Sequence, residues 1–349
     1  MDYQKFILPH IWNLKPYSSA RDEFKGKEGV FLDANENPLG SGNIAPWNRY
    51  PDPMQWNIKE QLAEIKHCAI DQIFLGNGSD EAIDLLIRMT CNPAKDHVII
   101  CPPTYGMYEV SASVNNIEIK RINLTADYQL NVEEICAQLN ERSKLIFICS
   151  PNNPTGNKLN RESIYAILDM FTSGFVIVDE AYIDFSDEPS FINELAKFPN
   201  LIVMQTLSKA YGLASLRLGM AYANPIIIQL LNKIKPPYNI GGATQELVEI
   251  ALSNKEFVKT SIETLNNAKK ALISGLNNLP GTKHIYPSNA NFILVKFEQA
   301  QELFDYLIEQ KIITRNRSTV TLCEDSIRIT IGTTEENNLL LEKMKRFYA

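Results

Sequence analysis

The chain has 349 residues, of which 45% are hydrophobic and 21% are charged, and its formal net charge at pH 7 is −7. A chain of this size can bury a large core, and we expect two domains. The negative charge argues against a nucleic-acid-binding surface, and no apolar run approaches the roughly 20 residues that span a bilayer. The first residues lack the apolar core of a signal peptide, so we expect a cytoplasmic protein.

The six cysteines and four histidines are scattered along the chain. No two cysteines have the Cys-x-x-Cys spacing that is typical of zinc and redox sites. We therefore expect neither a disulfide framework nor a metal site, and we interpret the cysteines as buried thiols.

The N-terminal segment, residues 1–28, is predicted to be an arm, because its polar and aromatic residues show no clear periodicity. Residues 30–32 predict a short strand, and the Asn, Pro and Gly residues at positions 33–40 mark an ordered turn. A second stiff loop, residues 49–53, contains Tyr50. From the residues alone, Tyr50 is interpreted as a surface aromatic packed on prolines.

Short apolar runs alternate with polar loops and helical patterns between residues 73 and 223. Five of these runs predict buried strands, at residues 73–75, 97–101, 144–149, 175–178 and 201–204. Strands that alternate with helices are typical of an α/β domain with a mostly parallel sheet. Because ligands bind beyond the carboxyl ends of such strands, we expect the functional site in the loops that follow them.

A glycine loop at residues 76–81 precedes a pattern in which the apolar residues have helical spacing from Ala82 onward. The N-terminus of a helix presents free N–H groups and a partial positive charge. The backbone at Ser79 and Asp80 could therefore bind a phosphate. The alternative is that Ser79 only caps the helix.

Lys209 lies where the predicted strand at residues 201–204 gives way to a loop. A lysine withdrawn from water loses its proton more readily and can form a Schiff base with a carbonyl, including that of pyridoxal phosphate (PLP). Thr206, Ser208 and Arg217 could hold the phosphate of that cofactor. The alternative is a solvated loop lysine, so the assignment depends on the rest of the chain.

Two further strand ends carry residues that suit a flat, cationic ring. Tyr105 lies on a proline-stiffened loop after the strand at residues 97–101, and it could stack on such a ring. Asp179 follows four apolar residues of another strand, where a carboxylate is costly unless a cation pairs with it. The pyridinium nitrogen of PLP would be such a cation.

The pattern changes after residue 223. Residues 244–278 are largely helical, and strand, helix, strand and helix patterns follow at 292–295, 300–309, 326–331 and from 335 onward. We therefore predict a large α/β domain over residues 29–255 and a smaller α+β domain over residues 256–349.

Arginines of the smaller domain could bind the anionic groups of substrates. Arg328 lies in a predicted strand between Ile327 and Ile329, so its side chain should point away from the core and face the site. Arg315 could supply further donors to a phosphate. For each arginine the alternative is a surface salt bridge, and this alternative is strongest for Arg317.

Taken together, these motifs resemble the fold-type I PLP-dependent aminotransferases, and within them the branch that acts on histidinol phosphate. The matching segments follow the family's order through almost the whole chain, at residues 35–38, 49–51, 76–81, 102–108, 151–156, 179–182 and 206–219, with Arg328 near the end. The resemblance implies PLP as the cofactor and a homodimer whose active sites lie at the subunit interface. It also implies an amino transfer from histidinol phosphate to 2-oxoglutarate, which yields glutamate.

The resemblance implies a role for each candidate residue. Lys209 would be the Schiff-base lysine and the base that moves a proton, Asp179 would pair with the pyridinium nitrogen, and Tyr182 would bind the ring's 3′-oxygen. The remaining cofactor contacts are implied for Ser79, Asp80, Thr206, Ser208, Arg217, Asn153, Tyr105 and the partner subunit's Tyr50. The substrate contacts are implied for Arg328, Arg315, Tyr17 and Asn35.

Other activities remain open from the sequence. An aromatic aminotransferase or a threonine-phosphate decarboxylase would keep the same cofactor site. A regulatory protein with this fold but without turnover would need an added DNA-binding module, for which 349 residues leave no room. We expect small-molecule substrates and no nucleic-acid or membrane partner.

Overall fold

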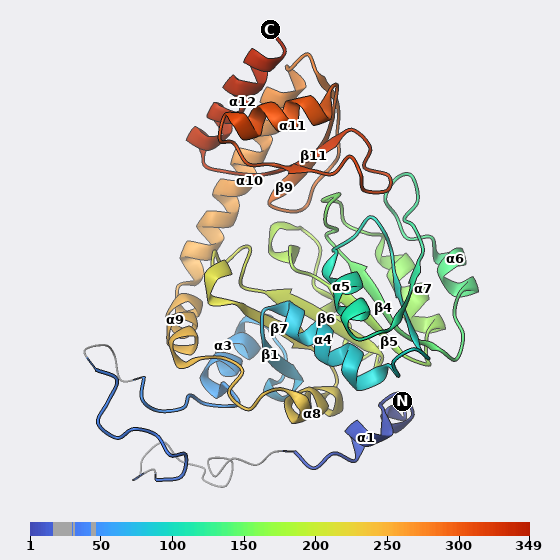
Figure 1. Cartoon of the computed structure of the whole chain (residues 1–349), viewed down its shortest axis with the longest axis vertical. Helices are drawn as coiled ribbons and strands as arrows, with labels where there is room; N and C mark the ends of the chain where they lie inside the picture. The colour runs from blue at the N-terminus through green and yellow to red at the C-terminus, as the bar shows by residue number, and fades with distance from the viewer. Residues whose placement is uncertain (17–29, 31, 43–46) are drawn as a thin grey trace.

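The computed structural model describes residues 1–16, 30, 32–42 and 47–349. Its ribbon contains two sheets, each accompanied by helices (Figure 1). Part of the predicted arm, including Tyr17, lies outside the described residues. Among the residues that are described, no helix is long and apolar enough to cross a bilayer, and no cluster of His, Cys, Asp and Glu could hold a metal ion.

A seven-stranded sheet forms the larger part of the molecule, with the strand order β1-β7-β6-β5-β4-β2-β3. Neighbouring strands from β6 to β3 are parallel, whereas β7 is antiparallel to both β6 and β1. The strands are β1 Ile73–Asn77, β2 His97–Ile100, β3 Glu118–Arg121, β4 Ser143–Cys149, β5 Phe175–Asp179, β6 Leu201–Thr206 and β7 Leu218–Tyr222. The prediction of a mostly parallel α/β sheet is confirmed.

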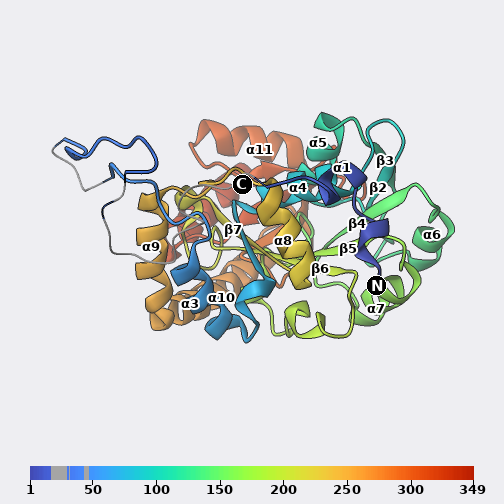
Figure 2. The same cartoon turned by 90° about the horizontal axis from the view of Figure 1, so that it is seen from below.

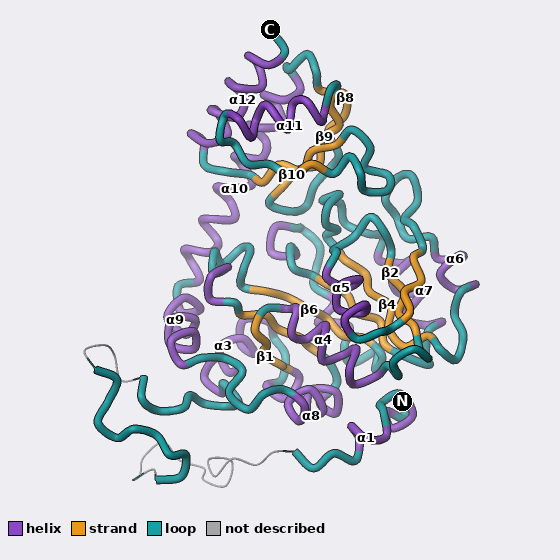
Figure 3. The backbone as a smooth tube through the Cα atoms, viewed as in Figure 1, coloured by secondary structure: helices purple, strands orange, loops and turns teal. Residues whose placement is uncertain are grey.

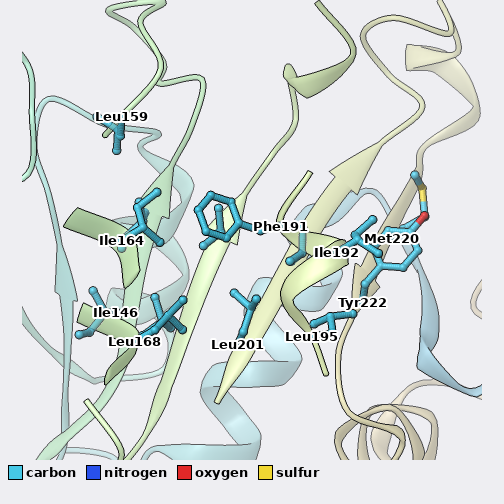
Figure 4. Close-up of a cluster of buried hydrophobic side chains, with 14 of the residues drawn as sticks. Ile146, Leu159, Ile164, Leu168, Phe191, Ile192, Leu195, Leu201, Met220 and Tyr222 are labelled. Atoms are coloured by element: carbon cyan, nitrogen blue, oxygen red, sulfur yellow. The ribbon is translucent and has the colours of Figure 1, made fainter. Parts of the chain in front are cut away.

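Strand β4 shows why the sequence predicts this sheet well. Ile146 and Ile148 pack into one hydrophobic cluster, whereas Leu145 and Phe147 pack into a second one. Successive side chains of a strand point to opposite faces, so a strand that is covered on both faces must be apolar throughout. Figure 4 shows side chains of the first cluster, among them Ile146 and Leu168.

Helices cover both faces of the large sheet. α4, α5 and α8 contribute to one cluster, and α3, α6 and α7 contribute to the other. The helices are α1 Pro9–Trp12, α3 Trp56–Lys66, α4 Ser79–Thr90, α5 Met107–Val114, α6 Val132–Ala137, α7 Arg161–Met170 and α8 Pro225–Ile234. Short 3-10 helices are η1 Tyr3–Lys5, η2 Ile70–Gln72, η3 Ile183–Phe185, η4 Phe191–Glu194 and η5 Ala214–Leu216. Figure 2 shows α8 from below, with α1 in contact with it.

The smaller part contains a four-stranded antiparallel sheet with the order β10-β11-β9-β8. Its strands are β8 Thr282–Ile285, β9 Phe292–Phe297, β10 Arg315–Asn316 and β11 Ser326–Thr330, and its helices are α11 Ala300–Glu309 and α12 Thr334–Phe347. The expected α+β arrangement is confirmed.

Two consecutive helices, α9 Gly242–Ser253 and α10 Lys255–Asn277, join the two parts. Figure 3 shows α10 running from the large part to the small sheet. Its residues Leu272 and Leu276 are buried in the hydrophobic cluster of the small part. We retain a domain boundary at residue 256 as a proposal, because the chain changes from one core to the other along α10.

One prediction near the N-terminus differs from the structure. Val30 and Leu32 lie in no strand and are 88% and 87% exposed, because neither pairs with a neighbouring strand among the described residues. The beginning of the predicted arm forms η1 and α1. The hydroxyl of Tyr3 donates to the carbonyl of Pro199 at 2.9 Å, and this contact fixes the chain start on the large part.

All six cysteines are free thiols. Four of them are buried as predicted, but Cys68 and Cys136 are only partly buried. The prediction is wrong for these two because Cys68 packs only against the edge of the main cluster and Cys136 lies on the short helix α6, where only Ile135 is buried.

Candidate active site

A cavity of about 740 Å³ lies at the carboxyl ends of β4, β5 and β6. Loops of the large sheet form one side of the cavity, and the small part supplies the arginines of the other side. Most of the predicted site residues line it, namely Ser79, Asp80, Tyr105, Asn153, Asp179, Tyr182, Thr206, Ser208, Lys209, Arg217, Arg315 and Arg328. Parallel strands end at the same edge of a sheet, which is why motifs far apart in the sequence meet here.

Lys209 lies in the loop after β6 and lines the cavity. Its Nζ atom is 5.5 Å from the centroid of the Tyr182 ring. Burial lowers the pKa of the Lys209 amine, and the positive charge of Arg328 lowers this pKa further, whereas Asp179 opposes the effect. A lowered pKa increases the fraction of neutral amine, which is the nucleophilic form.

The N-terminus of α4 meets the cavity at Ser79 and Asp80. Its N-cap residue is Gly78, with φ of 75°, and no side chain caps the helix there. The backbone N–H groups of the first turn are therefore suited to bind an anion. The positive φ of Gly78 favours glycine, and a Cβ atom there would lie 2.6 Å from Nη2 of Arg217, so the guanidinium would have to shift. Ser79 is the first helical residue, and the alternative that it caps the helix is wrong.

Side-chain donors surround the same helix end. The hydroxyl of Thr206 donates to Oγ of Ser208 at 3.0 Å, and Nη1 of Arg217 donates to the same Ser208 oxygen at 3.5 Å. Nη2 of Arg217 lies 3.7 Å from a carboxylate oxygen of Asp80. Hydroxyls, a guanidinium and an uncapped helix end form the donor set that a phosphate needs, so these residues fit the phosphate group of PLP.

Asp179 ends β5 and is only 2% exposed. Its Oδ2 atom accepts a hydrogen bond from the Tyr108 hydroxyl at 2.6 Å, and its Oδ1 atom accepts one from the backbone N–H of Ala181 at 3.1 Å. Burial raises the pKa of Asp179 to about 6, although both hydrogen bonds oppose the rise. A buried carboxylate at the wall of a cavity is suited to a cationic partner within that cavity.

Arg328 connects the small sheet to the cavity. Ile327 and Ile329 are buried in the small core, and the alternation of a strand directs the side chain between them to the other face. The guanidinium donates from Nη1 to Oδ1 of Asn153 and lies 5.2 Å above the ring of Phe292. The geometry therefore places a cation beside an amide that also lines the cavity.

Two predicted residues, Tyr50 and Asn35, are not among those that line this cavity. Tyr50 is 49% exposed and stacks on Tyr238, with ring centroids 4.4 Å apart. Tyr50 and Asn35 border a second hollow, of about 510 Å³, together with residues 241–244. Tyr17 lies outside the described residues. Within one chain, Tyr50 and Asn35 therefore share no cavity with Lys209.

Sequence reasoning missed two residues of the site. Tyr108 is fully buried beside Asp179 and stacks on Phe147, with ring centroids 4.8 Å apart. Its spacing of three residues from Tyr105, close to one helical turn, was the available signal. Arg317 lines the cavity, and no ion pair of the described residues supports the surface salt bridge that was its alternative. Its spacing of two residues from Arg315, which places both on one side of an extended chain, was the signal in that case.

The comparisons with known proteins agree with this geometry. A family model described as aminotransferase class I and II matches residues 28–344. The chain belongs to the class I and II aminotransferase family. Among curated relatives, the histidinol-phosphate aminotransferase of Parabacteroides distasonis is 51% identical over 344 residues, which cover 99% of this chain and 98% of the relative.

Solved structures show the same fold. The histidinol-phosphate aminotransferase of Clostridium acetobutylicum has a TM-score of 0.79 at 23% identity, covering 86% of this chain and 91% of that one. The histidinol-phosphate aminotransferase of Sinorhizobium meliloti, in complex with pyridoxal-5′-phosphate, has a TM-score of 0.79 at 21% identity. The match covers 90% of this chain and 89% of that one. At these identities the likeness concerns the fold, and the expected fold class is confirmed.

Proposed function

We propose that this protein is a PLP-dependent aminotransferase that acts on histidinol phosphate and 2-oxoglutarate. Its products would be 3-(imidazol-4-yl)-2-oxopropyl phosphate and glutamate. The observation that carries the proposal is the cavity itself, in which Lys209 lies between a phosphate cradle, the buried carboxylate of Asp179 and several arginines. The relative that is 51% identical over nearly the whole chain supports this choice of substrate.

The cofactor supplies a carbonyl that bonds the substrate amine and a ring that withdraws electrons from the adjacent carbon. The N–H groups of Ser79 and Asp80, the hydroxyls of Thr206 and Ser208, and the guanidinium of Arg217 would hold its phosphate. Asp179 would hold the proton of the pyridine nitrogen, since a carboxylate stabilises a cation at that atom. The other ring contacts are proposed for Asn153 and Tyr182 at the 3′-oxygen and for Tyr105 at the ring face.

Lys209 would move the proton of the substrate's α-carbon. A general base works best when its pKa lies near the working pH, and burial together with Arg328 shifts the pKa of Lys209 downward from its usual value. Arg328 would bind the α-carboxylate of glutamate in one half of the cycle and the phosphate of histidinol phosphate in the other half. Arg315 would add donors to the phosphate.

We also infer that the protein is a homodimer in which Tyr50 reaches the cofactor phosphate of the other subunit, with Tyr17 and Asn35 near the substrate. The exposure of Tyr50 outside its own chain's cavity supports this arrangement. The cytoplasm is the proposed compartment, because all six cysteines are free, and two of them are partly exposed.

A panel of amino donors tests the substrate assignment. The purified protein with PLP is supplied with histidinol phosphate, phenylalanine, tyrosine or threonine phosphate, each with and without 2-oxoglutarate. We expect histidinol phosphate to give the highest kcat/KM and one glutamate for each donor consumed. Carbon dioxide release from threonine phosphate, or a preference for phenylalanine, would identify one of the alternative enzymes instead.

A further inference from the structure

The wall of the cavity that belongs to the small part carries three arginines, Arg315, Arg317 and Arg328. Arg315 and Arg328 face each other across the β10–β11 pair. Arg317 follows β10, and its backbone N–H donates to the carbonyl of Ser326 at 2.8 Å, which keeps the chain extended beside β11. The three guanidiniums therefore come from neighbouring positions of one small sheet.

No carboxylate among the described residues forms an ion pair with any of these arginines. Arg328 instead donates to the neutral amide oxygen of Asn153. The Nε atom of Arg317 is buried without an acceptor among the described groups. Three cations at one wall of a cavity that pair with no carboxylate among the described residues are suited to an anionic ligand.

The electrostatics of the cluster support the same interpretation. Burial is the main cause that lowers the pKa of Arg317, to about 10, and the charges of Arg328 and Arg315 lower it further. Arg317 is still a cation at neutral pH, because this pKa lies well above 7. The three cations repel one another, and an anion between them would relieve the repulsion.

The charge of the anion decides how many guanidiniums it can use. A carboxylate carries one negative charge on two oxygens, and a single planar guanidinium can bind it through two hydrogen bonds. A phosphate monoester carries a charge of about −1.5 to −2 at neutral pH and has three acceptor oxygens. A third arginine therefore matches a phosphate ester and exceeds the need of a carboxylate.

We propose that Arg317 is the residue that favours the phosphorylated substrate over the dicarboxylic one, as the third guanidinium around the substrate phosphate. This proposal rests on the proposed function, because it assumes that one anion site serves both substrates. Arg317 binds the phosphate in the histidinol phosphate half of the cycle and contributes little to the glutamate half.

Separate half-reactions test this role. The protein with bound PLP is mixed with histidinol phosphate alone or with glutamate alone, and the change in the cofactor spectrum gives kcat/KM for each. Arg317→Gln should lower kcat/KM for histidinol phosphate about 10-fold to 100-fold, mainly through KM, and change the glutamate value less than about threefold. Arg317→Lys should recover part of the loss, because it restores the charge without the planar fork.

The matched control is Arg346→Gln, which removes an exposed arginine of the same domain that is paired with Glu342. It should change neither half-reaction. Competition by inorganic phosphate against glutamate gives a second readout. The inhibition constant of phosphate should rise in Arg317→Gln and stay unchanged in Arg346→Gln. An equal loss in both half-reactions, or unchanged inhibition by phosphate, would overturn the proposal.

The outcomes also separate this inference from the proposed function. If the unmodified protein does not react with histidinol phosphate, the proposed function fails, whereas inhibition by inorganic phosphate still reports on Arg317. If the unmodified protein does react and Arg317→Gln reacts equally well, only the inference about Arg317 fails.

Discussion

Two side chains of opposite charge define the centre of the site at the scale of single residues. Asp179 ends β5 and Lys209 lies in the loop after the neighbouring parallel strand β6, so the two strands place both residues in the same cavity. Burial shifts the two pKa values toward each other, because it disfavours the charged form of both groups. Such opposed shifts within one cavity are typical of catalytic sites.

The first prediction concerns Lys209. Lys209→Ala should still bind PLP through the phosphate cradle, but it should lose the covalent bond to the cofactor and at least about 1,000-fold in kcat, since it removes both nucleophile and base. Borohydride reduction of the unmodified protein, followed by peptide mapping, should label Lys209. A label on any other lysine would refute the assignment.

The second prediction concerns the hydrogen bond from Tyr108 to Asp179. The pKa of Asp179 is about 6, so in the cofactor-free protein the carboxyl gains a proton as the pH falls through that value. A neutral carboxyl cannot pair with a cationic ring, and PLP affinity should therefore fall below about pH 6. Tyr108→Phe removes a stabilising hydrogen bond from the carboxylate and should raise the pKa of Asp179. Its affinity for PLP should then fall at a higher pH, by about twofold to tenfold at pH 7.

Titration of PLP binding between pH 5 and 8 measures this effect. Tyr165→Phe is the matched control, because that hydroxyl donates to Glu194 at 2.9 Å and does not line the cavity. If Tyr108→Phe and Tyr165→Phe have the same pH profile of PLP affinity, Tyr108 does not set the pKa of Asp179.

At the scale of elements, the sequence predicts the parallel strands well. β4, β5 and β6 are buried on both faces and must be apolar, which is a local property that the sequence displays directly. The residues at or just beyond their carboxyl ends, such as Asp179 and Lys209, are therefore placed at one edge without knowledge of the packing. The strand predicted at residues 30–32 fails because three apolar residues do not determine a pairing partner.

Contacts between elements explain what the sequence could not predict. Arg317 enters the cavity because β10 pairs with β11, and this pairing of two residues per strand leaves no periodic signal. Tyr108 reaches Asp179 because α5 packs on the sheet beside Phe147. Tyr108 and Asp179 are far apart in the chain, and the two-residue strand β10 is too short to be predicted, so residue types alone do not disclose either contact.

The third prediction concerns the approach of β7 to the N-terminus of α4. A Cβ atom on Gly219 would lie 2.1 Å from the backbone nitrogen of Ser79. Gly219→Ala should push the helix end away, lower the free energy of unfolding by about 1–3 kcal/mol and weaken PLP binding, because Ser79 belongs to the phosphate cradle. Gly106→Ala is the control for stability, since a Cβ there would meet nothing within 4 Å. Urea unfolding of the two cofactor-free variants measures their free energies of unfolding. Equal values for Gly219→Ala and Gly106→Ala would contradict the close approach.

At the scale of the whole molecule, one region of the large part exposes apolar side chains on neighbouring segments. These are Trp47, Tyr50 and Trp56 near the start of α3, Leu247 and Ile250 on α9, and Phe257 on α10. α3 packs against α9, so these segments lie together. Exposed apolar patches of this kind mark interaction surfaces, which is consistent with the proposed dimer.

The fourth prediction is that Tyr50 completes the site of the other subunit. Two inactive or weakened variants, Lys209→Ala and Tyr50→Phe, are mixed under conditions that allow subunits to exchange. If Tyr50 acts across the dimer, each mixed dimer has one site with both lesions and one site with neither. Random exchange at equal amounts should then restore about a quarter of the activity of the unmodified protein, because half of the dimers are mixed and each has one intact site of two.

If Tyr50 acted within its own chain, each mixed dimer would carry one lesion in each site. The mixture would then have about half the activity of the Tyr50→Phe protein at equal total protein, since only its subunits would retain Lys209. Mixing Lys209→Ala with the unmodified protein controls for the effect of exchange itself. Activity well above half that of the Tyr50→Phe protein therefore distinguishes a shared site from a separate one, and activity equal to that half would remove Tyr50 from the proposed phosphate contacts.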